Sequence, residues 1–108
     1  MIKPSIILIG SEGRIGKRLF SLLNSINEFG IICIDNNLSE NSYSKNNNIL
    51  KIKLKLDNEK NAVYILDEIT NHKNLSNIIG IVNLSREFFN KKKQVSIDEK
   101  EMIKAIKS

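Results

Sequence analysis

The chain has 108 residues, of which 41% are hydrophobic and 27% are charged, with a formal net charge of +5 at pH 7. This length predicts one domain with a core of its own, and no apolar run approaches the roughly 18 residues of a membrane-spanning helix. With one cysteine (Cys33) and one histidine (His72), the sequence excludes a disulfide framework and a cysteine-based or histidine-rich metal site. No secretory signal pattern is present, so we expect a cytoplasmic protein.

The positive charge does not by itself indicate a nucleic-acid partner. Only three of the 17 basic residues are Arg, and the four Phe and two Tyr form no cluster. Nucleic-acid sites usually combine basic residues with aromatic rings or with Arg, which stack on bases and bind them in a bidentate manner. The lysines are therefore interpreted as solvated surface, and neither nucleic acid nor a membrane is expected as a partner.

The first third of the chain alternates strand and helix patterns. Residues 5–9 are mostly apolar and end at a glycine, which is typical of a strand buried on both faces. Residues 14–27 have helical periodicity, Gly30 is expected to end this helical region, and residues 31–34 predict a second buried strand. The apolar stripe of the helix comprises Ile15, Leu19, Leu22, Leu23 and Ile26.

The middle of the chain predicts a loop, a strand and a second helix. Residues 36–48 are rich in Asn and Ser without periodicity, and we expect an exposed loop there. Residues 49–56 alternate apolar side chains with Lys, which predicts a half-exposed strand near a sheet edge. Residues 59–71 return to helical periodicity.

The last third predicts a fourth strand and a third helix. Residues 78–82 form another apolar run, which we interpret as a buried strand. Ser96 and Glu99 have the spacing of a capping box, so a last helix is expected to begin there.

Buried strands that alternate with amphipathic helices indicate an α/β fold with a parallel sheet covered on both faces. The favoured arrangement is a Rossmann-like, doubly wound sheet of about four strands in the order 3-2-1-4, formed by residues 1–108 as a single domain. Ligands of such sheets bind where the strand order reverses, at the carboxyl end of the first strand.

A glycine-rich turn follows the first strand at this point. A first glycine permits a sharp turn, a second lets a pyrophosphate approach the backbone, and a third allows close packing of helix on strand. The helix that begins here directs free N–H groups and the positive end of its dipole at the phosphates. The turn comprises Gly10, Ser11, Glu12, Gly13, Arg14, Ile15 and Gly16.

A carboxylate closes the second predicted strand. Asp35 lies 19 residues after Gly16, which suits a side chain that accepts both ribose hydroxyls and repels a 2′-phosphate. We therefore expect NAD as the cofactor and disfavour NADP. Arg14 is expected to neutralise a phosphate, and Asn36 to assist at the ribose.

With these residues the chain resembles the first half of a short-chain dehydrogenase/reductase. The resemblance rests on the glycine turn, Asp35, the pair Asp57-Asn58 after the third strand, and Asn83 at the end of the fourth. It implies that Asp57 meets the adenine amino group with Asn58 alongside, and that Asn83 lines the adenine ribose side.

The sequence also departs from this family. The segment that begins at Asn83 lacks the family's Ala-Gly, and neither Tyr43 nor Tyr64 is followed by Lys four residues later. A catalytic Tyr needs such a Lys to act as an acid at neutral pH. We therefore expect the cofactor-binding half of an NAD-dependent oxidoreductase, a truncated or partial chain without catalytic residues.

Two alternatives remain open. One is a non-catalytic NAD-binding or regulatory module, and the other is a Rossmann reductase similar to dihydrodipicolinate reductase. In a truncated chain the fourth strand is expected to lie uncovered at the sheet edge, where unpaired backbone groups favour self-association. A stable monomer would instead favour the self-contained NAD-binding module.

Overall fold

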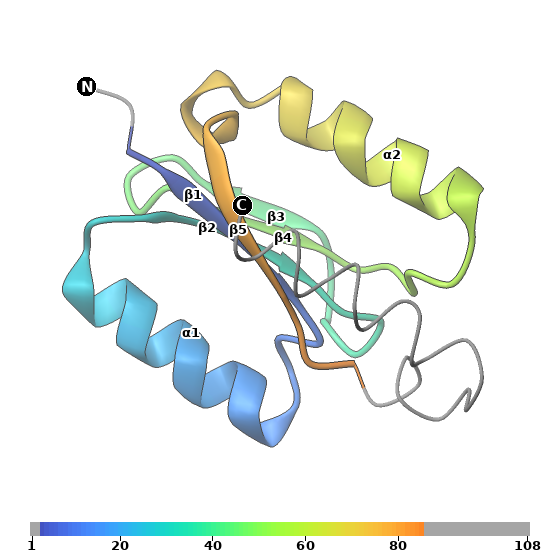
Figure 1. The fold of residues 1–108 in the computed structure, drawn as a ribbon, viewed down its shortest axis with the longest axis horizontal. Helices are drawn as coiled ribbons and strands as arrows, with labels where there is room; N and C mark the ends of the chain where they lie inside the picture. Colours follow the sequence, from blue (N-terminus) through green and yellow to red (C-terminus); the bar gives the residue numbers. More distant parts are fainter. Residues whose placement is uncertain (1–2, 86–108) are drawn as a thin grey trace.

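The computed structural model describes residues 3–85 and has an α/β architecture (Figure 1). The predicted helix at Ser96 and Glu99 lies outside the described residues. In chain order the elements are β1 (Ser5–Ile9), α1 (Arg14–Ile26), β2 (Gly30–Ile34), β3 (Ser42–Ser44), β4 (Ile49–Ile52), α2 (Glu59–Thr70), the 3-10 turn η1 (Lys73–Leu75) and β5 (Ile78–Asn83).

The strands form one mostly parallel sheet in the order β3-β4-β2-β1-β5. β1 pairs in parallel with β2 and β5, and β2 pairs in parallel with β4, whereas β3 pairs antiparallel with β4. The predicted α/β class is thus confirmed, but the strand order differs from the predicted order of four, because β3 adds a fifth strand beyond β4. The four parallel strands follow the order β4-β2-β1-β5.

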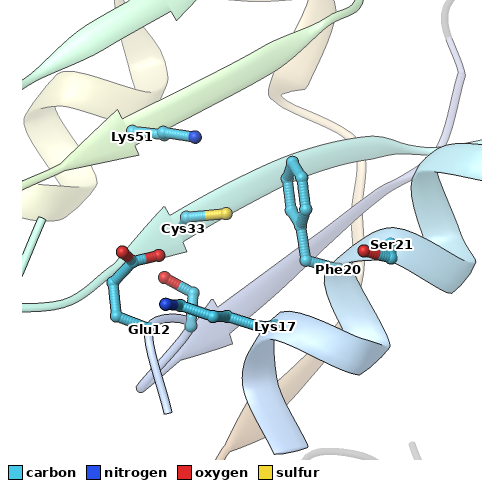
Figure 2. Close-up of a pocket in the computed structure, with 7 residues that line it drawn as sticks. Glu12, Lys17, Phe20, Ser21, Cys33 and Lys51 are labelled. Carbon is cyan, nitrogen blue, oxygen red and sulfur yellow. The ribbon is translucent and has the colours of Figure 1, made fainter. Parts of the chain in front are cut away.

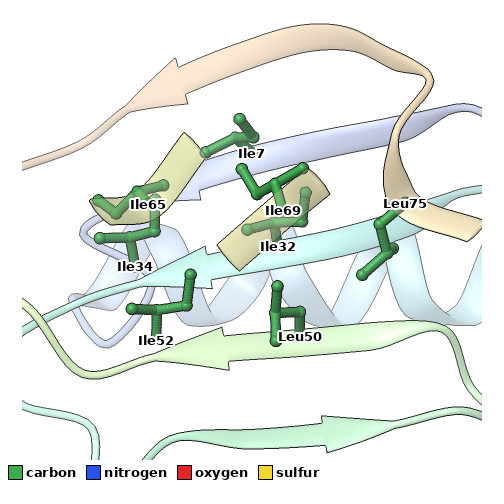
Figure 3. Close-up of a cluster of buried hydrophobic side chains, with 8 residues drawn as sticks. All are labelled: Ile7, Ile32, Ile34, Leu50, Ile52, Ile65, Ile69 and Leu75. Carbon is green, nitrogen blue, oxygen red and sulfur yellow. The ribbon is translucent and has the colours of Figure 1, made fainter. Parts of the chain in front are cut away.

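The two helices cover opposite faces of the sheet (Figure 1). On one face, Ile65 and Ile69 of α2 pack with Ile32 of the central strand β2 (Figure 3). On the other face, Leu23 of α1 packs with Leu8 and with neighbouring side chains of β2. Successive side chains of a strand point to opposite faces, so β2 is buried along its whole length.

Two predictions for the residues after β2 are wrong. The expected loop at residues 36–48 contains β3, and the strand expected over residues 49–56 ends at Ile52. Beyond Ile52 the backbone forms hydrogen bonds with loop residues and not with a strand. The Lys53 N–H donates to Asn41 Oδ1 (2.6 Å), and the Leu54 N–H donates to the Asp35 carbonyl (3.3 Å). The alternation of Lys and Leu there has no strand partner.

Helix α1 also differs from its predicted form. It ends at Asn27, which adopts a left-handed conformation (φ 58°) and donates its N–H to the Leu23 carbonyl. Gly30 instead begins β2, where an added Cβ would lie 2.6 Å from Ser5 Oγ. The expected stripe is only partly buried, because Ile15 is 66% exposed and Leu22 is 57% exposed.

Strand β5 is half-buried rather than buried as expected, and Ile79 is 52% exposed. Among residues 3–85, β5 pairs with β1 alone, so it lies at the sheet edge in this part of the chain. Self-association through this strand stays a prediction. No helix in the described part of the chain is long and apolar enough to cross a membrane.

Candidate functional site: the glycine turn at the end of β1

Gly10 is the point at which the chain leaves β1. Its φ of +84° is a conformation that side chains disfavour, and an added Cβ would lie 2.9 Å from the carbonyl carbon of Leu84 and from the Ser85 nitrogen. The Leu84 N–H donates to the Ile9 carbonyl (2.7 Å). The turn therefore needs glycine here, because the segment after β5 passes directly against it.

Gly16 fixes helix α1 onto the same turn. An added Cβ at Gly16 would collide with the Gly10 carbonyl oxygen and would lie 2.8 Å from Ser11 Cα. These neighbours are backbone atoms, which cannot rotate away as a side chain can. The close helix–strand packing expected of the third glycine is what the structure shows.

Gly13 is the N-cap of α1, and its surroundings differ from those of Gly10 and Gly16. Its φ of −73° is open to any residue, and an added Cβ would meet only the Gly10 carbonyl oxygen, at an ordinary 3.6 Å. No side chain caps the helix, and its first turn contains no acidic residue. The N–H groups of Arg14, Ile15 and Gly16 therefore point out of an uncapped helix start.

Asp35 is tied to the glycine turn from the end of β2. One carboxylate oxygen, Oδ2, accepts the Glu12 N–H (2.8 Å), and the other, Oδ1, accepts the Asn37 N–H (2.8 Å). Each oxygen keeps a second lone pair. Asn37, which sequence reasoning missed, makes the contact beside Asp35, whereas Asn36 is an exposed neighbour; an Asx-type turn after a strand was the available signal.

Asp57 and Asn58 form a separate polar group. Asn58 is the N-cap of α2, and its Oδ1 accepts the Asn61 N–H (2.8 Å). Asp57 Oδ1 accepts from the side-chain amides of Asn58 (3.0 Å) and Asn61 (3.3 Å). Both residues are exposed, and within residues 3–85 their hydrogen bonds do not reach the glycine turn.

Asn83 is brought close to the turn. It ends β5, pairs in register with Ile9 at the end of β1, and is half-buried. Its Oδ1 accepts the Ser85 N–H (2.9 Å), which shapes the segment that packs on Gly10. Of the predicted site residues after β1, the structure thus gathers the glycine turn, Asp35 and Asn83. Asp57 and Asn58 form side-chain hydrogen bonds with each other and with Asn61.

A cavity of about 280 Å³ lies behind the turn, on the face of the sheet that carries α1. Its lining includes Phe20 and Lys17 of α1, Cys33 of β2 and Lys51 of β4 (Figure 2). The Lys51 ammonium lies 5.3 Å from the centroid of the Phe20 ring. Sequence reasoning missed this cavity, because it interpreted Lys51 as solvated surface; Lys51 is half-buried.

The thiol of Cys33 is neutral at physiological pH. Its burial raises the pKa of this thiol to about 11, against the lowering effects of the Ser11 hydroxyl and the Lys51 ammonium, and the carboxylates of Glu12 and Asp35 raise it further. Only a thiolate is a strong nucleophile, so Cys33 is a buried packing residue, as the sequence indicates.

The described part of the chain contains no group of three or more His, Cys, Asp or Glu side chains that could hold a metal ion. Comparisons of the chain with protein-family models, with curated proteins and with solved structures found no match.

Proposed function

We propose that the chain binds NAD at the glycine turn, as the cofactor-binding part of an oxidoreductase of the short-chain dehydrogenase/reductase type. The observation that carries the proposal is the start of α1. Three backbone N–H groups there lack a capping side chain, and the residue beside them is a glycine that the protein's own packing does not require.

An anionic group is what this helix start accommodates best. Uncapped N–H groups at a helix N-terminus carry partial positive charge and bind phosphate. A side chain at Gly13 would not strain the backbone, since its φ is ordinary. A glycine in such a position is explained if the space beside it belongs to the pyrophosphate of a dinucleotide.

Asp35 supports the ribose end of the same ligand. Its two backbone partners, Glu12 and Asn37, hold the carboxylate in place beside the turn. The remaining lone pairs can accept the 2′- and 3′-hydroxyls of a ribose, and the negative charge repels a 2′-phosphate. The proposal therefore names NAD and disfavours NADP.

Bound NAD would supply or accept a hydride, whereas the residues of this chain bind and orient it. Gly13 and the start of α1 would hold the pyrophosphate, and Asp35 the adenosine ribose. The family's Tyr-x-x-x-Lys is not found in residues 1–108. Dinucleotide binding is accordingly the activity that this chain is expected to show by itself.

Titration calorimetry with NAD+ and with NADP+ tests the proposal. We expect NAD+ to bind more tightly than NADP+, and Gly13→Val to weaken NAD+ binding at least about tenfold, as expected for lost charge-assisted hydrogen bonds. Asp35→Asn, which keeps one oxygen as an acceptor, is expected to reduce the preference for NAD+.

Gly80→Ala is the matched control, because an added Cβ at Gly80 has no atom within 4 Å and lies away from the turn. It is expected to bind NAD+ as the parent chain does. Unchanged binding by a folded Gly13→Val variant, or equal affinity for the two dinucleotides, would remove the turn from the proposed site.

A further inference from the structure

The cavity behind the glycine turn exists because of how β2 is connected to β4. In the described fold this connection carries the short strand β3 and no helix. Helix α1 packs against β1 and β2, so the part of this face over Cys33 and Lys51 is left open beside α1. The result is a recess of about 280 Å³, close to the lower end of the range for small-molecule sites, about 300 Å³.

The side chains that line this recess carry more positive than negative charge, and the Asp35 carboxylate acts on Cys33 from outside the lining. Two ammonium groups, Lys17 and Lys51, line it together with one carboxylate, Glu12. Figure 2 shows Lys17 and Lys51 entering the recess from different elements, α1 and β4. The lining therefore favours a guest with a single negative charge.

The inner wall contains a polar group that lacks a proper partner. The Ser11 side chain is buried (2% exposed), and its hydroxyl makes no hydrogen bond of normal geometry within the described chain. It lies beside Cys33, whose thiol is neutral and does not repel an anion. A thiol is a weak hydrogen-bond acceptor, so an acceptor on an anionic guest would satisfy the Ser11 hydroxyl better than Cys33 does.

We propose that this recess binds a small organic carboxylate with a flat apolar group. The carboxylate would accept hydrogen bonds from Lys17, Lys51 and the Ser11 hydroxyl, while the apolar group packs against the Phe20 ring. Glu12 disfavours a dianion such as phosphate. The recess shares Ser11 and Glu12 with the glycine turn, but its lining does not include Gly13 or the other residues with free N–H groups at the start of α1, so the proposal does not depend on dinucleotide binding.

Benzoate, acetate and inorganic phosphate are the probes that test this site. We expect NMR titration of the whole chain to show benzoate shifting the Phe20 ring resonances, with a Kd of about 1 mM. Acetate, which lacks the ring, and phosphate, which carries more charge, are expected to bind at least about tenfold more weakly.

Lys51→Met keeps the stem of the side chain and removes its charge, and is expected to weaken benzoate binding about tenfold. Lys53→Met is the matched control, because Lys53 is exposed on the same segment and does not line the recess; it should leave the Kd unchanged. Ser11→Ala should also weaken binding. An equal loss in both lysine variants, no shift at Phe20, or tighter binding of phosphate than of benzoate would overturn the proposal.

Discussion

Helices α1 and α2 of the described residues begin at the same end of the sheet, yet their first turns are built in opposite ways. Helix α2 starts with Asn58, whose side chain accepts a backbone N–H of the first turn, and continues with the acidic residue Glu59. Helix α1 starts with Gly13, has no side-chain cap, and contains no acidic residue in its first turn.

The difference supports the proposal that the start of α1 binds an anionic ligand. The Asn58 side chain accepts one backbone N–H of the first turn of α2, and Glu59 places a negative charge at the positive end of the helix dipole. At α1 the same groups lack an internal partner, at a place where the end of β1, Asp35 and Asn83 converge. The uncapped N–H groups at the start of α1, compared with the capped start of α2, support the proposed external ligand at α1.

The largest effect is expected from Gly16. Gly16→Ala would force backbone atoms of the glycine turn apart and should lower the free energy of unfolding by about 3 kcal/mol. Gly13→Ala, whose Cβ meets an ordinary contact, is expected to cost less than about 1 kcal/mol. Urea unfolding followed by circular dichroism measures both, and similar losses would mean that the two glycines do not differ as their surroundings indicate.

The recess behind α1 can be probed through the titration of Cys33. The thiol pKa is raised to about 11 in the folded chain, from an unfolded value of 9.0. Above pH 9.0 the unfolded chain loses this proton first, so the stabilisation is complete below that pH and is lost as the pH rises to about 11.

When the pH is raised from 8 to 10.5, the ionisation of Cys33 is therefore expected to lower the free energy of unfolding by about 2 kcal/mol, in addition to the effects of other groups. The measurement is the difference between the parent chain and Cys33→Ala in urea unfolding at the two pH values. A thiolate absorbance midpoint near 9 in the folded chain would contradict it.

Removing the cap of α2 is expected to have a moderate effect. Asn58→Ala should lower the free energy of unfolding by about 1 kcal/mol, and Asn58→Ser should restore most of it, because a serine hydroxyl can accept the same N–H. Asn47→Ala in the exposed loop before β4 provides the control. If Asn58→Ala leaves NAD+ binding intact, the role of Asn58 is limited to capping.

The smallest effect on stability, and the most informative one, is expected when α1 is given the cap that it lacks. In Gly13→Ser the hydroxyl would occupy a free N–H of the first turn and should raise the free energy of unfolding by a few tenths of a kcal/mol. The same hydroxyl would block the phosphate, so NAD+ affinity should fall. A variant that is both more stable and a better binder would refute the contrast between the two helix starts.

Much of the framework was predictable because it is encoded in local patterns. The apolar runs of β1 and β2, and the start of α1 after Gly10 and Gly13, each follow from a few consecutive residues. Asp35 was identified by its distance from the turn, and the structure places it in contact with Glu12. These features depend on short patterns and spacings in the sequence, so one sequence is enough to predict them.

The errors lie where distant backbone groups decide the outcome. Strand β3 has the sequence Ser-Tyr-Ser and is held by its antiparallel pairing with β4. The periodicity of its side chains does not indicate this pairing. In the sequence, the pair Asp57-Asn58 fits an adenine contact as well as a helix N-cap. The structure shows that both side chains accept hydrogen bonds from Asn61. Leu22 fits the helical stripe of α1 as well as Leu23 does, but only Leu23 meets the sheet.

Strand β3 bears on the behaviour of this protein at high concentration. Ile49, Leu50 and Ile52 give β4 the composition of an interior strand, and a bare apolar edge of that kind recruits other chains. Three residues of β3 occupy that edge, with Ser42 exposed and the Tyr43 ring in contact with the His72 ring. A proline at position 43 would leave both helices and the parallel strands in place while opening β4 to other molecules, so the damage would be aggregation rather than unfolding.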